Sequence, residues 1–130
     1  MSKKVSFVFM NFIVVSALLF SVQAGAGEAV SAPVVVSTNT AYGGISYARY
    51  SSDSTQTIYC GVGTDGWLNC YARNSSGTSK SCYASPGDAN YDQFVQVVMS
   101  INPASRIWFH WNSDGKCDAM SLLNGSKYLD

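Results

Sequence analysis

The sequence has little charge and few of the side chains that enzymes use for acid–base chemistry. Only 12% of its 130 residues are charged, the eight basic and eight acidic residues cancel, and there is a single histidine. Zero net charge gives no electrostatic reason to expect a nucleic-acid partner. Because 47% of the residues are apolar, the composition suits one folded core and argues against intrinsic disorder.

Several motifs that carry chemistry are also missing. Glu28 is the only glutamate, and most aspartates stand beside Gly, Ser or Pro, where the side chain serves turns and helix caps. No pair of carboxylates therefore stands out for glycoside hydrolysis. The sequence contains no phosphate-binding glycine loop, no calcium loop of the D-x-D-x-D-G type and no G-x-S-x-G elbow. From these patterns we nominate no catalytic set, no metal and no cofactor.

No apolar run reaches the roughly 20 residues that a membrane-spanning helix needs. The N-terminal run, residues 5–20, follows a short basic start and leads to the sequence Val-Gln-Ala at residues 22–24, which resembles a signal-peptidase site. A membrane anchor is the alternative, but no charged stop-transfer segment follows. We predict that residues 1–24 are a signal peptide. The mature protein is then secreted or periplasmic, without stable membrane insertion.

All four cysteines follow this predicted signal peptide, and an even number in an exported protein predicts two disulfides. A four-cysteine zinc site is the alternative. Its ligands usually come as C-x(2–4)-C pairs, however, whereas Cys60, Cys70, Cys82 and Cys117 are separated by 9, 11 and 34 residues.

Three disulfide pairings are possible in principle. A turn at residues 74–77 would bring Cys70 opposite Cys82 on antiparallel strands, which leaves Cys60 to pair with Cys117. We favour this pairing. The same reasoning places Cys60 opposite Cys70 across a turn at residues 63–66, so the alternative stays open.

Six segments are predicted to be β-strands, two of them (residues 43–51 and 106–111) from alternating side chains and the others from the turns that join them to a neighbouring strand. They are residues 43–51, 56–62, 67–73, 80–84, 106–111 and 116–123. Residues 91–99 instead repeat apolar side chains at helical spacing, after a Ser-Pro-Gly-Asp start signal at residues 85–88 and before a stop at Asn102-Pro103.

These elements predict an α+β fold, a mainly antiparallel sheet in the order β-β-β-β-α-β-β with one packed helix and two stabilising disulfides. The domain is expected to occupy residues 43–130. Residues 25–42 are small and rich in Ser, Ala and Val, which predicts a flexible lead-in with residues 34–36 as a candidate edge strand.

Aromatic residues make up 13% of the chain, and their positions are the strongest indication of a binding surface. One face of each strand packs on the helix, and the other is free to carry a recognition surface of aromatic and polar side chains. On two predicted strands, aromatic and polar side chains occupy the face turned away from the core. They are Trp67, Tyr71, Arg73, Arg106, Trp108 and His110. We predict a ligand-binding surface from them; the alternative is that both faces are covered and the rings belong to the core.

His110 is also the one candidate for general-base chemistry. Such a role needs a partner carboxylate and a nucleophile, and Asp118 stands across the last hairpin turn. The alternative is a partly exposed strand histidine without catalytic function.

Three stretches resemble a loose group of small exported bacterial proteins that share this four-cysteine pattern and have no assigned function. They are RYSSDSTQTIYC at residues 49–60, CYARNSSGTSKSC at residues 70–82 and RIWFHWNSDGKC at residues 106–117. The resemblance covers about residues 43–123. It implies a bacterial, exported, single-domain protein and carries over no catalytic residue.

The sequence thus favours a small exported binding module for envelope polysaccharide or a protein partner. A small secreted hydrolase that uses His110 is one alternative, and a structural envelope or matrix component without a ligand is another.

Overall fold

The computed structural model describes residues 29–129. The predicted signal peptide lies outside these residues, as does the beginning of the predicted lead-in. Within residues 29–129 we find no helix with the length and apolar character needed to cross a membrane.

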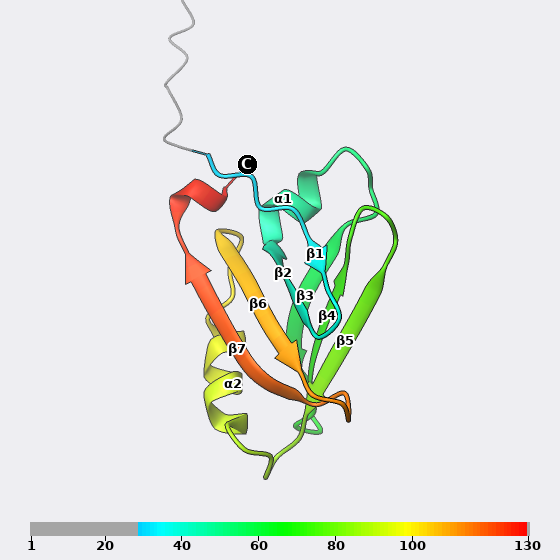
Figure 1. Cartoon of the computed structure of the whole chain (residues 1–130). Helices are drawn as coiled ribbons and strands as arrows, with labels where there is room; N and C mark the ends of the chain where they lie inside the picture. The colour runs from blue at the N-terminus through cyan, green and yellow to red at the C-terminus, as the bar shows by residue number, and fades with distance from the viewer. Residues whose placement is uncertain (1–28, 130) are drawn as a thin grey trace, which may run out of the picture.

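Within residues 29–129, seven strands form two antiparallel sheets (Figure 1). The four-stranded sheet has the order β1-β2-β6-β7 and consists of β1 (Val35–Val36), β2 (Thr40–Gly44), β6 (Ser105–Trp111) and β7 (Cys117–Asn124). The three-stranded sheet is a meander of β3 (Thr57–Val62), β4 (Leu68–Arg73) and β5 (Ser79–Ala84). The helical elements of the described residues are α1 (Ile45–Tyr50), α2 (Tyr91–Met99) and a short 3-10 turn, η2 (Ser126–Tyr128). The α+β, disulfide-stabilised fold class is confirmed.

Strict alternation along the strands builds a core between the two sheets. In β6 the side chains of Ile107, Phe109 and Trp111 are buried while their neighbours are half-buried, and β4 buries Leu68 and Ala72 in the same way. One face of α2, with Phe94 and Val98, completes this core. Burial of these apolar groups away from water is the main force that holds the sheets together.

The three turns expected from Gly, Asn and Asp are all formed. Residues 63–66, 74–77 and 112–115 each close with a backbone hydrogen bond from the terminal glycine to the first residue of the turn. The last of these joins β6 to β7 and packs against β5, where the backbone N–H of Tyr83 donates to the carbonyl of Gly115 at 3.2 Å. This contact brings the two sheets together at the turn.

Residues 43–51 differ from the sequence prediction, because β2 ends at Gly44 and the chain then turns into α1. Ile45 and Ala48, three residues apart, both pack against the core, and the hydroxyl of the buried Ser46 donates to the carbonyl of Pro103 at 2.9 Å. A helix of six residues is too short for its period to be distinguished from strand alternation, and these long-range contacts decide the conformation.

The predicted lead-in contributes to the domain from residue 30 onward, where the Val30 N–H donates to the carbonyl of Lys127 at 2.8 Å. Ala32 and Val34 are 2% and 3% exposed, and the Val34 N–H donates to the side-chain oxygen of Gln56 at 2.7 Å. Val35–Val36 is the edge strand β1, as its apolar residues indicated, and β2 begins at Thr40. The packed domain therefore starts before residue 43.

The helix α2 begins later than the start signal indicated. Its first residue is Tyr91, and Asn90 precedes it in the left-handed backbone conformation with φ of 62°. Residues 85–88 form a turn instead, in which the Ser85 N–H and hydroxyl both donate to the Asp88 carboxylate. The Asp88 side chain is thereby held where it pairs with Lys116 of the β6–β7 turn.

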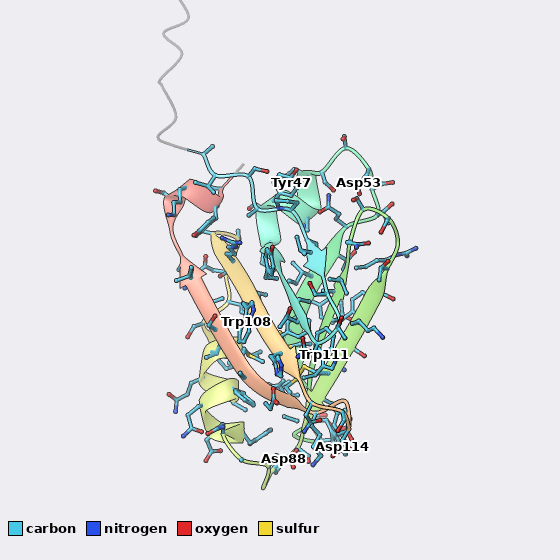
Figure 2. All side chains as sticks on the ribbon, in the orientation of Figure 1. Tyr47, Asp53, Asp88, Trp108, Trp111 and Asp114 are labelled. Atoms are coloured by element: carbon cyan, nitrogen blue, oxygen red, sulfur yellow. A yellow bond between two sulfur atoms is a disulfide. The ribbon has the colours of Figure 1, made fainter. Side chains whose placement is uncertain are left out.

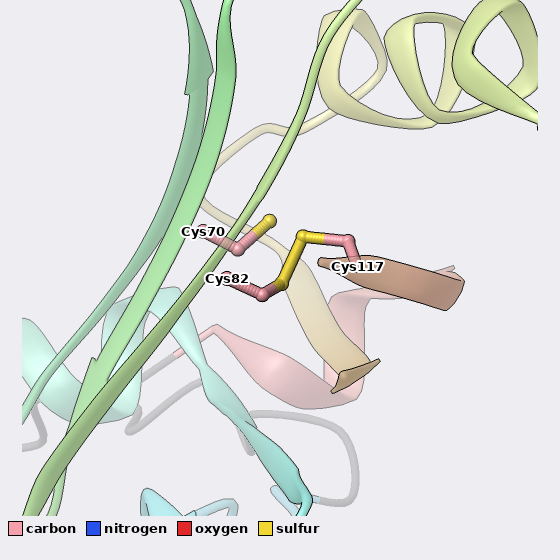
Figure 3. A group of neighbouring side chains, drawn as sticks. All are labelled: Cys70, Cys82 and Cys117. Carbon is pink, nitrogen blue, oxygen red and sulfur yellow. A yellow bond between two sulfur atoms is a disulfide. The ribbon is translucent and has the colours of Figure 1, made fainter. Parts of the chain in front are cut away.

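Two disulfides are present, as expected, but the favoured pairing is wrong. The bonds are Cys60–Cys70 and Cys82–Cys117. Cys70 lies on the central strand β4 and stands directly opposite both Cys60 of β3 and Cys82 of β5, so strand geometry allowed either bond. The β6–β7 turn places Cys117 beside Cys82, which settles the pairing (Figure 3). Because all four sulfurs are in disulfides, none offers a thiolate to zinc.

Candidate functional site

The six predicted ligand-binding residues are divided between the two sheets. Tyr71 and Arg73 belong to the three-stranded sheet, and Trp67 immediately precedes its central strand β4. Arg106, Trp108 and His110 belong to the four-stranded sheet. In each sheet they lie on the face turned away from the shared core. The structure therefore offers separate candidate surfaces instead of the single one predicted.

Four aromatic side chains share the outer side of the three-stranded sheet: Tyr59, Trp67, Tyr71 and Tyr83, which we call the aromatic face. Tyr59 and Tyr71 stand directly opposite each other on β3 and β4, with ring centroids 5.5 Å apart in a stacked arrangement. Trp67 lies 5.4 Å from Tyr83 on the neighbouring strand. Trp67 is 51% exposed and Tyr59 is 48% exposed, so much of this aromatic surface is in contact with water.

The turn before β4 fixes the position of Trp67. Its backbone N–H donates to the Asp65 carboxylate at 3.1 Å, and its carbonyl accepts from the Gly63 N–H at 2.9 Å. Polar side chains flank the rings: Asn69 and Arg73 are exposed on the same side of β4. Tyr59 and Tyr83 were missed by the sequence prediction, although each alternates with core residues of its strand in the same way as Tyr71 does with Cys70.

The outer side of the four-stranded sheet carries a smaller aromatic site. The Arg106 guanidinium lies over the Tyr42 ring, 5.1 Å from its centroid, and Trp108 stacks on His110 at 6.3 Å. Figure 2 labels Trp108 on β6. A hollow of about 250 Å³ is lined by Tyr42, Arg106, Trp108, Ser121 and Leu123. Trp108 is only half-buried here, so neither the prediction of exposure nor the core alternative describes it fully.

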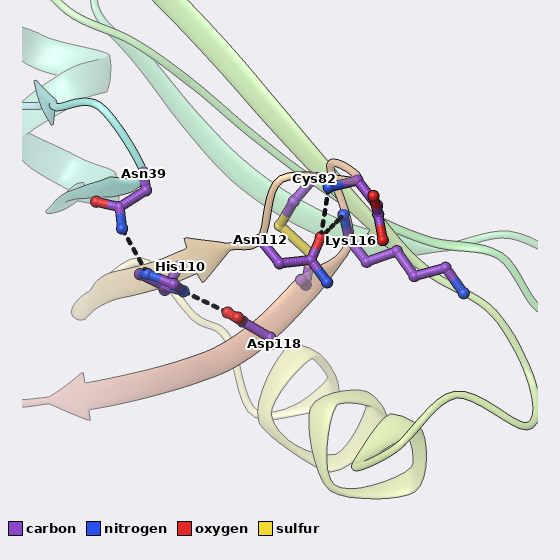
Figure 4. A network of polar contacts seen from close by, with 8 residues as sticks. Asn39, Cys82, His110, Asn112, Lys116 and Asp118 are labelled. Atoms are coloured by element: carbon purple, nitrogen blue, oxygen red, sulfur yellow. Dashed lines mark hydrogen bonds and ion pairs between the residues drawn. A yellow bond between two sulfur atoms is a disulfide. The ribbon is translucent and has the colours of Figure 1, made fainter.

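His110 is held by two side chains, one on each ring nitrogen (Figure 4). Its Nδ1 is hydrogen bonded to Asp118 of β7, as the hairpin geometry indicated, and its Nε2 lies 2.7 Å from Nδ2 of Asn39 in the β1–β2 turn. The three residues border an open groove of about 590 Å³, which also contains Lys80, Ser81 and Ser113. No hydroxyl group hydrogen bonds to His110 among the residues 29–129, and Asn39 occupies the position from which a nucleophile would give up its proton.

The ion pair between Lys116 and Asp88 lies at the edge of the same hairpin. Hydrogen bonding to the Lys116 ammonium group, and then to Ser85, lowers the pKa of Asp88 from its ordinary value of 3.8 to about 2. Hydrogen bonding to Asp88 in turn raises the pKa of Lys116. This pair ties the turn before α2 to the β6–β7 hairpin, and it lies outside the lining of the groove.

Comparison with known proteins identifies no relative: no protein-family model, no curated protein and no solved structure matches the chain.

Proposed function

We propose that this protein is an exported glycan-binding module and that the aromatic face is its binding surface. The observation that carries the proposal is the pair of half-exposed rings, Trp67 and Tyr59, each placed against a second ring on the outer side of the three-stranded sheet. Exposed groups of large apolar side chains are uncommon on soluble proteins and mark interaction sites.

The chemistry of the face suits a sugar chain. A pyranose ring has an apolar C–H side that packs on a flat aromatic ring, and hydroxyl groups around its edge that need hydrogen-bonding partners. The tyrosine hydroxyls supply such partners, as do the exposed side chains of Asn69 and Arg73 on the same side of β4. The exposed large apolar side chains of this sheet are aromatic, without exposed Leu, Ile or Met, which favours a glycan over the aliphatic surface of a protein partner.

Export is part of the same proposal. Two disulfides are typical of proteins that fold in an oxidising compartment, and the predicted signal peptide agrees with that location. We therefore propose that the protein acts in the periplasm or outside the cell, where polysaccharides of the envelope are its candidate ligands.

The experiment is a co-sedimentation assay of the purified, oxidised protein with insoluble peptidoglycan, chitin and cellulose, followed by tryptophan fluorescence titration with soluble fragments of whichever is bound. We expect Trp67→Ala to weaken binding by about tenfold, the effect of losing roughly 1.4 kcal/mol of ring contact. Trp67 is exposed, so the variant should keep its fold, which circular dichroism verifies.

Trp108→Ala is the matched control, because it removes the same side chain from the other sheet. Loss of binding in Trp108→Ala with retention in Trp67→Ala would move the site to the Tyr42–Trp108 hollow. If the folded wild-type protein binds none of the three polysaccharides, the proposal is wrong.

The hydrolase alternative has one supporting observation, the hydrogen bond between His110 and Asp118 in an open groove. The Asn39 side chain at Nε2 opposes it, because a general base needs that nitrogen for the proton of its nucleophile. The binding module is therefore the better-supported proposal.

A further inference from the structure

Three of the four cysteine sulfurs form one cluster, although they belong to two different disulfides. The Sγ atoms of Cys70, Cys82 and Cys117 all lie within 4.8 Å of one another. Figure 3 shows the sulfur of Cys70 directly beside the bond between Cys82 and Cys117. The two disulfides are therefore neighbours in space, and Cys70 is the point at which they meet.

The strand register allows Cys70 two partners. On β4 it stands directly opposite Cys60 of β3 and directly opposite Cys82 of β5. Directly opposed residues on antiparallel strands have Cβ atoms close enough for a disulfide. A bond from Cys70 to Cys82 therefore fits the backbone as it stands, without a change of register.

Access from solvent distinguishes the two disulfides. Cys60 lies on the edge strand β3 and is only partly buried, whereas Cys70, Cys82 and Cys117 are all buried. The rate of thiol–disulfide exchange depends on which sulfur the attacking thiolate can reach. An external thiol will therefore meet Cys60 first.

We propose that the two disulfides act as a relay that begins at Cys60. A low-molecular-weight thiol reacts with Cys60, and the exchange that follows breaks the Cys82–Cys117 bond between the sheets. The external thiolate attacks Sγ of Cys60, forms a mixed disulfide there, and expels Cys70 as a thiolate. Cys70 then attacks Sγ of Cys82 in the cluster, the Cys70–Cys82 bond forms, and the Cys82–Cys117 bond breaks. Cys117 leaves as a thiolate and takes a proton from water.

The relay balances, because there are two disulfides and one thiol both before and after it. The external thiol is consumed, and the thiol of Cys117 appears in its place. The relay changes what the second bond connects. Cys82–Cys117 joins the three-stranded sheet to the four-stranded sheet, whereas Cys70–Cys82 joins two strands of the same sheet. Exchange at the surface thus removes the covalent link between the sheets, next to Asp118 and the His110 groove.

The test is disulfide mapping of the oxidised protein before and after incubation with glutathione, with acid quenching and alkylation of free thiols. We expect the untreated protein to give the Cys60–Cys70 and Cys82–Cys117 peptides. After treatment, glutathionylated Cys60, the Cys70–Cys82 peptide and alkylated Cys117 should appear in a one-to-one-to-one ratio.

Two variants separate the relay from unspecific reduction. Cys60→Ser leaves Cys70 as a free thiol in the cluster. Because Cys70 can then attack Cys82 and release Cys117, we expect alkylation of both Cys70 and Cys117 in this variant. Cys70→Ser is the matched control: it leaves Cys60 free but removes the relay, so Cys117 should stay protected. Near-ultraviolet circular dichroism verifies that each variant is folded. Two results would overturn the proposal. One is that Cys117 is not alkylated in either the glutathione-treated wild type or Cys60→Ser; the other is a Cys70–Cys117 disulfide as the product.

Discussion

The imidazole of His110 is hydrogen bonded through Nδ1 to the carboxylate of Asp118, eight residues further along the β6–β7 hairpin. A carboxylate in its ionised form can only accept hydrogen bonds, so Nδ1 carries a proton. The Asn39 amide is then the donor to Nε2 in the neutral ring. One strand partner and one turn residue together fix the tautomer of the only histidine in the sequence.

Without the Asp118 carboxylate, the His110 ring should no longer be restricted to the Nδ1–H tautomer. In Asp118→Ala we expect His110 to shift from the Nδ1–H form toward a mixture with the Nε2–H form, detected by the ¹⁵N shifts of its ring nitrogens. Asn39→Ala is the matched control and should keep the Nδ1–H form. Identical ring shifts in wild type and Asp118→Ala would contradict the assignment. Because Asp118 is exposed, its loss should change the unfolding free energy by less than about 1 kcal/mol.

Gly43 of β2 should not accept a methyl group. A Cβ at this position would lie 2.9 Å from the Cα of Val34, which is backbone and cannot move aside easily. We expect Gly43→Ala to reduce the unfolding free energy by roughly 1–3 kcal/mol, the usual effect of overpacking. Gly61 of β3 is the control, since nothing lies within 4 Å of its Cβ position. Gly61→Ala should be neutral or stabilise by up to about 1 kcal/mol. Equal urea midpoints for the two variants would contradict the packing at Val34.

The ion pair of Asp88 with Lys116 should make stability depend on pH in the acid range. The pKa of Asp88 is lowered from 3.8 to about 2 in the folded protein, so its stabilising contribution is complete above about pH 4 and is lost as the pH falls through about 2. We expect the difference in unfolding free energy between wild type and Asp88→Asn to shrink over that interval. Adding Lys116→Met to Asp88→Asn should cause little further loss, because the partner is already absent. A difference that stays constant from pH 6 to pH 2 would show that the pair contributes nothing.

The two disulfides should differ in what they contribute to stability. Cys82–Cys117 spans 35 positions of the chain and Cys60–Cys70 spans ten. Loop-closure entropy predicts a loss of about 4 kcal/mol when the longer bond is removed and about 3 kcal/mol for the shorter one. Cys82→Ala/Cys117→Ala should therefore unfold at a lower urea concentration than Cys60→Ala/Cys70→Ala. The reverse order would mean that the inter-sheet bond is not the principal covalent constraint.

Local patterns in the sequence identified most elements of the fold. The β3–β4–β5 meander, the body of α2 and the final hairpin follow from alternation, apolar spacing and turn residues that lie close together in the chain. Ile45–Tyr50 could not be assigned correctly in this way, because Ser46 is anchored by Pro103, far along the sequence. The division into two sheets also depends on distant pairs: β2 meets β6, with Tyr42 opposite Trp108.

The candidate site was predictable in its parts but not in its assembly. Alternation correctly placed Trp67 and Tyr71 opposite Cys70, and Asp118 near His110. It could not show that Trp67 and Trp108 belong to different sheets, since that depends on pairings between distant segments. The disulfide preference was wrong for a related reason: Cys70 has a suitable neighbour on either side of β4, and only the position of Cys117 decides between them.

The strand order also sets a sequence of events for folding. The three-stranded sheet pairs neighbouring segments, so it can form early, and Cys60 can join Cys70 as soon as the first hairpin closes. The four-stranded sheet must wait for β6, because β2 has its main partner more than 60 residues downstream. During synthesis of the chain, β2 therefore emerges long before β6 can pair with it. Pulse alkylation during oxidative refolding should show Cys60–Cys70 before Cys82–Cys117, and the opposite order would contradict this sequence of events.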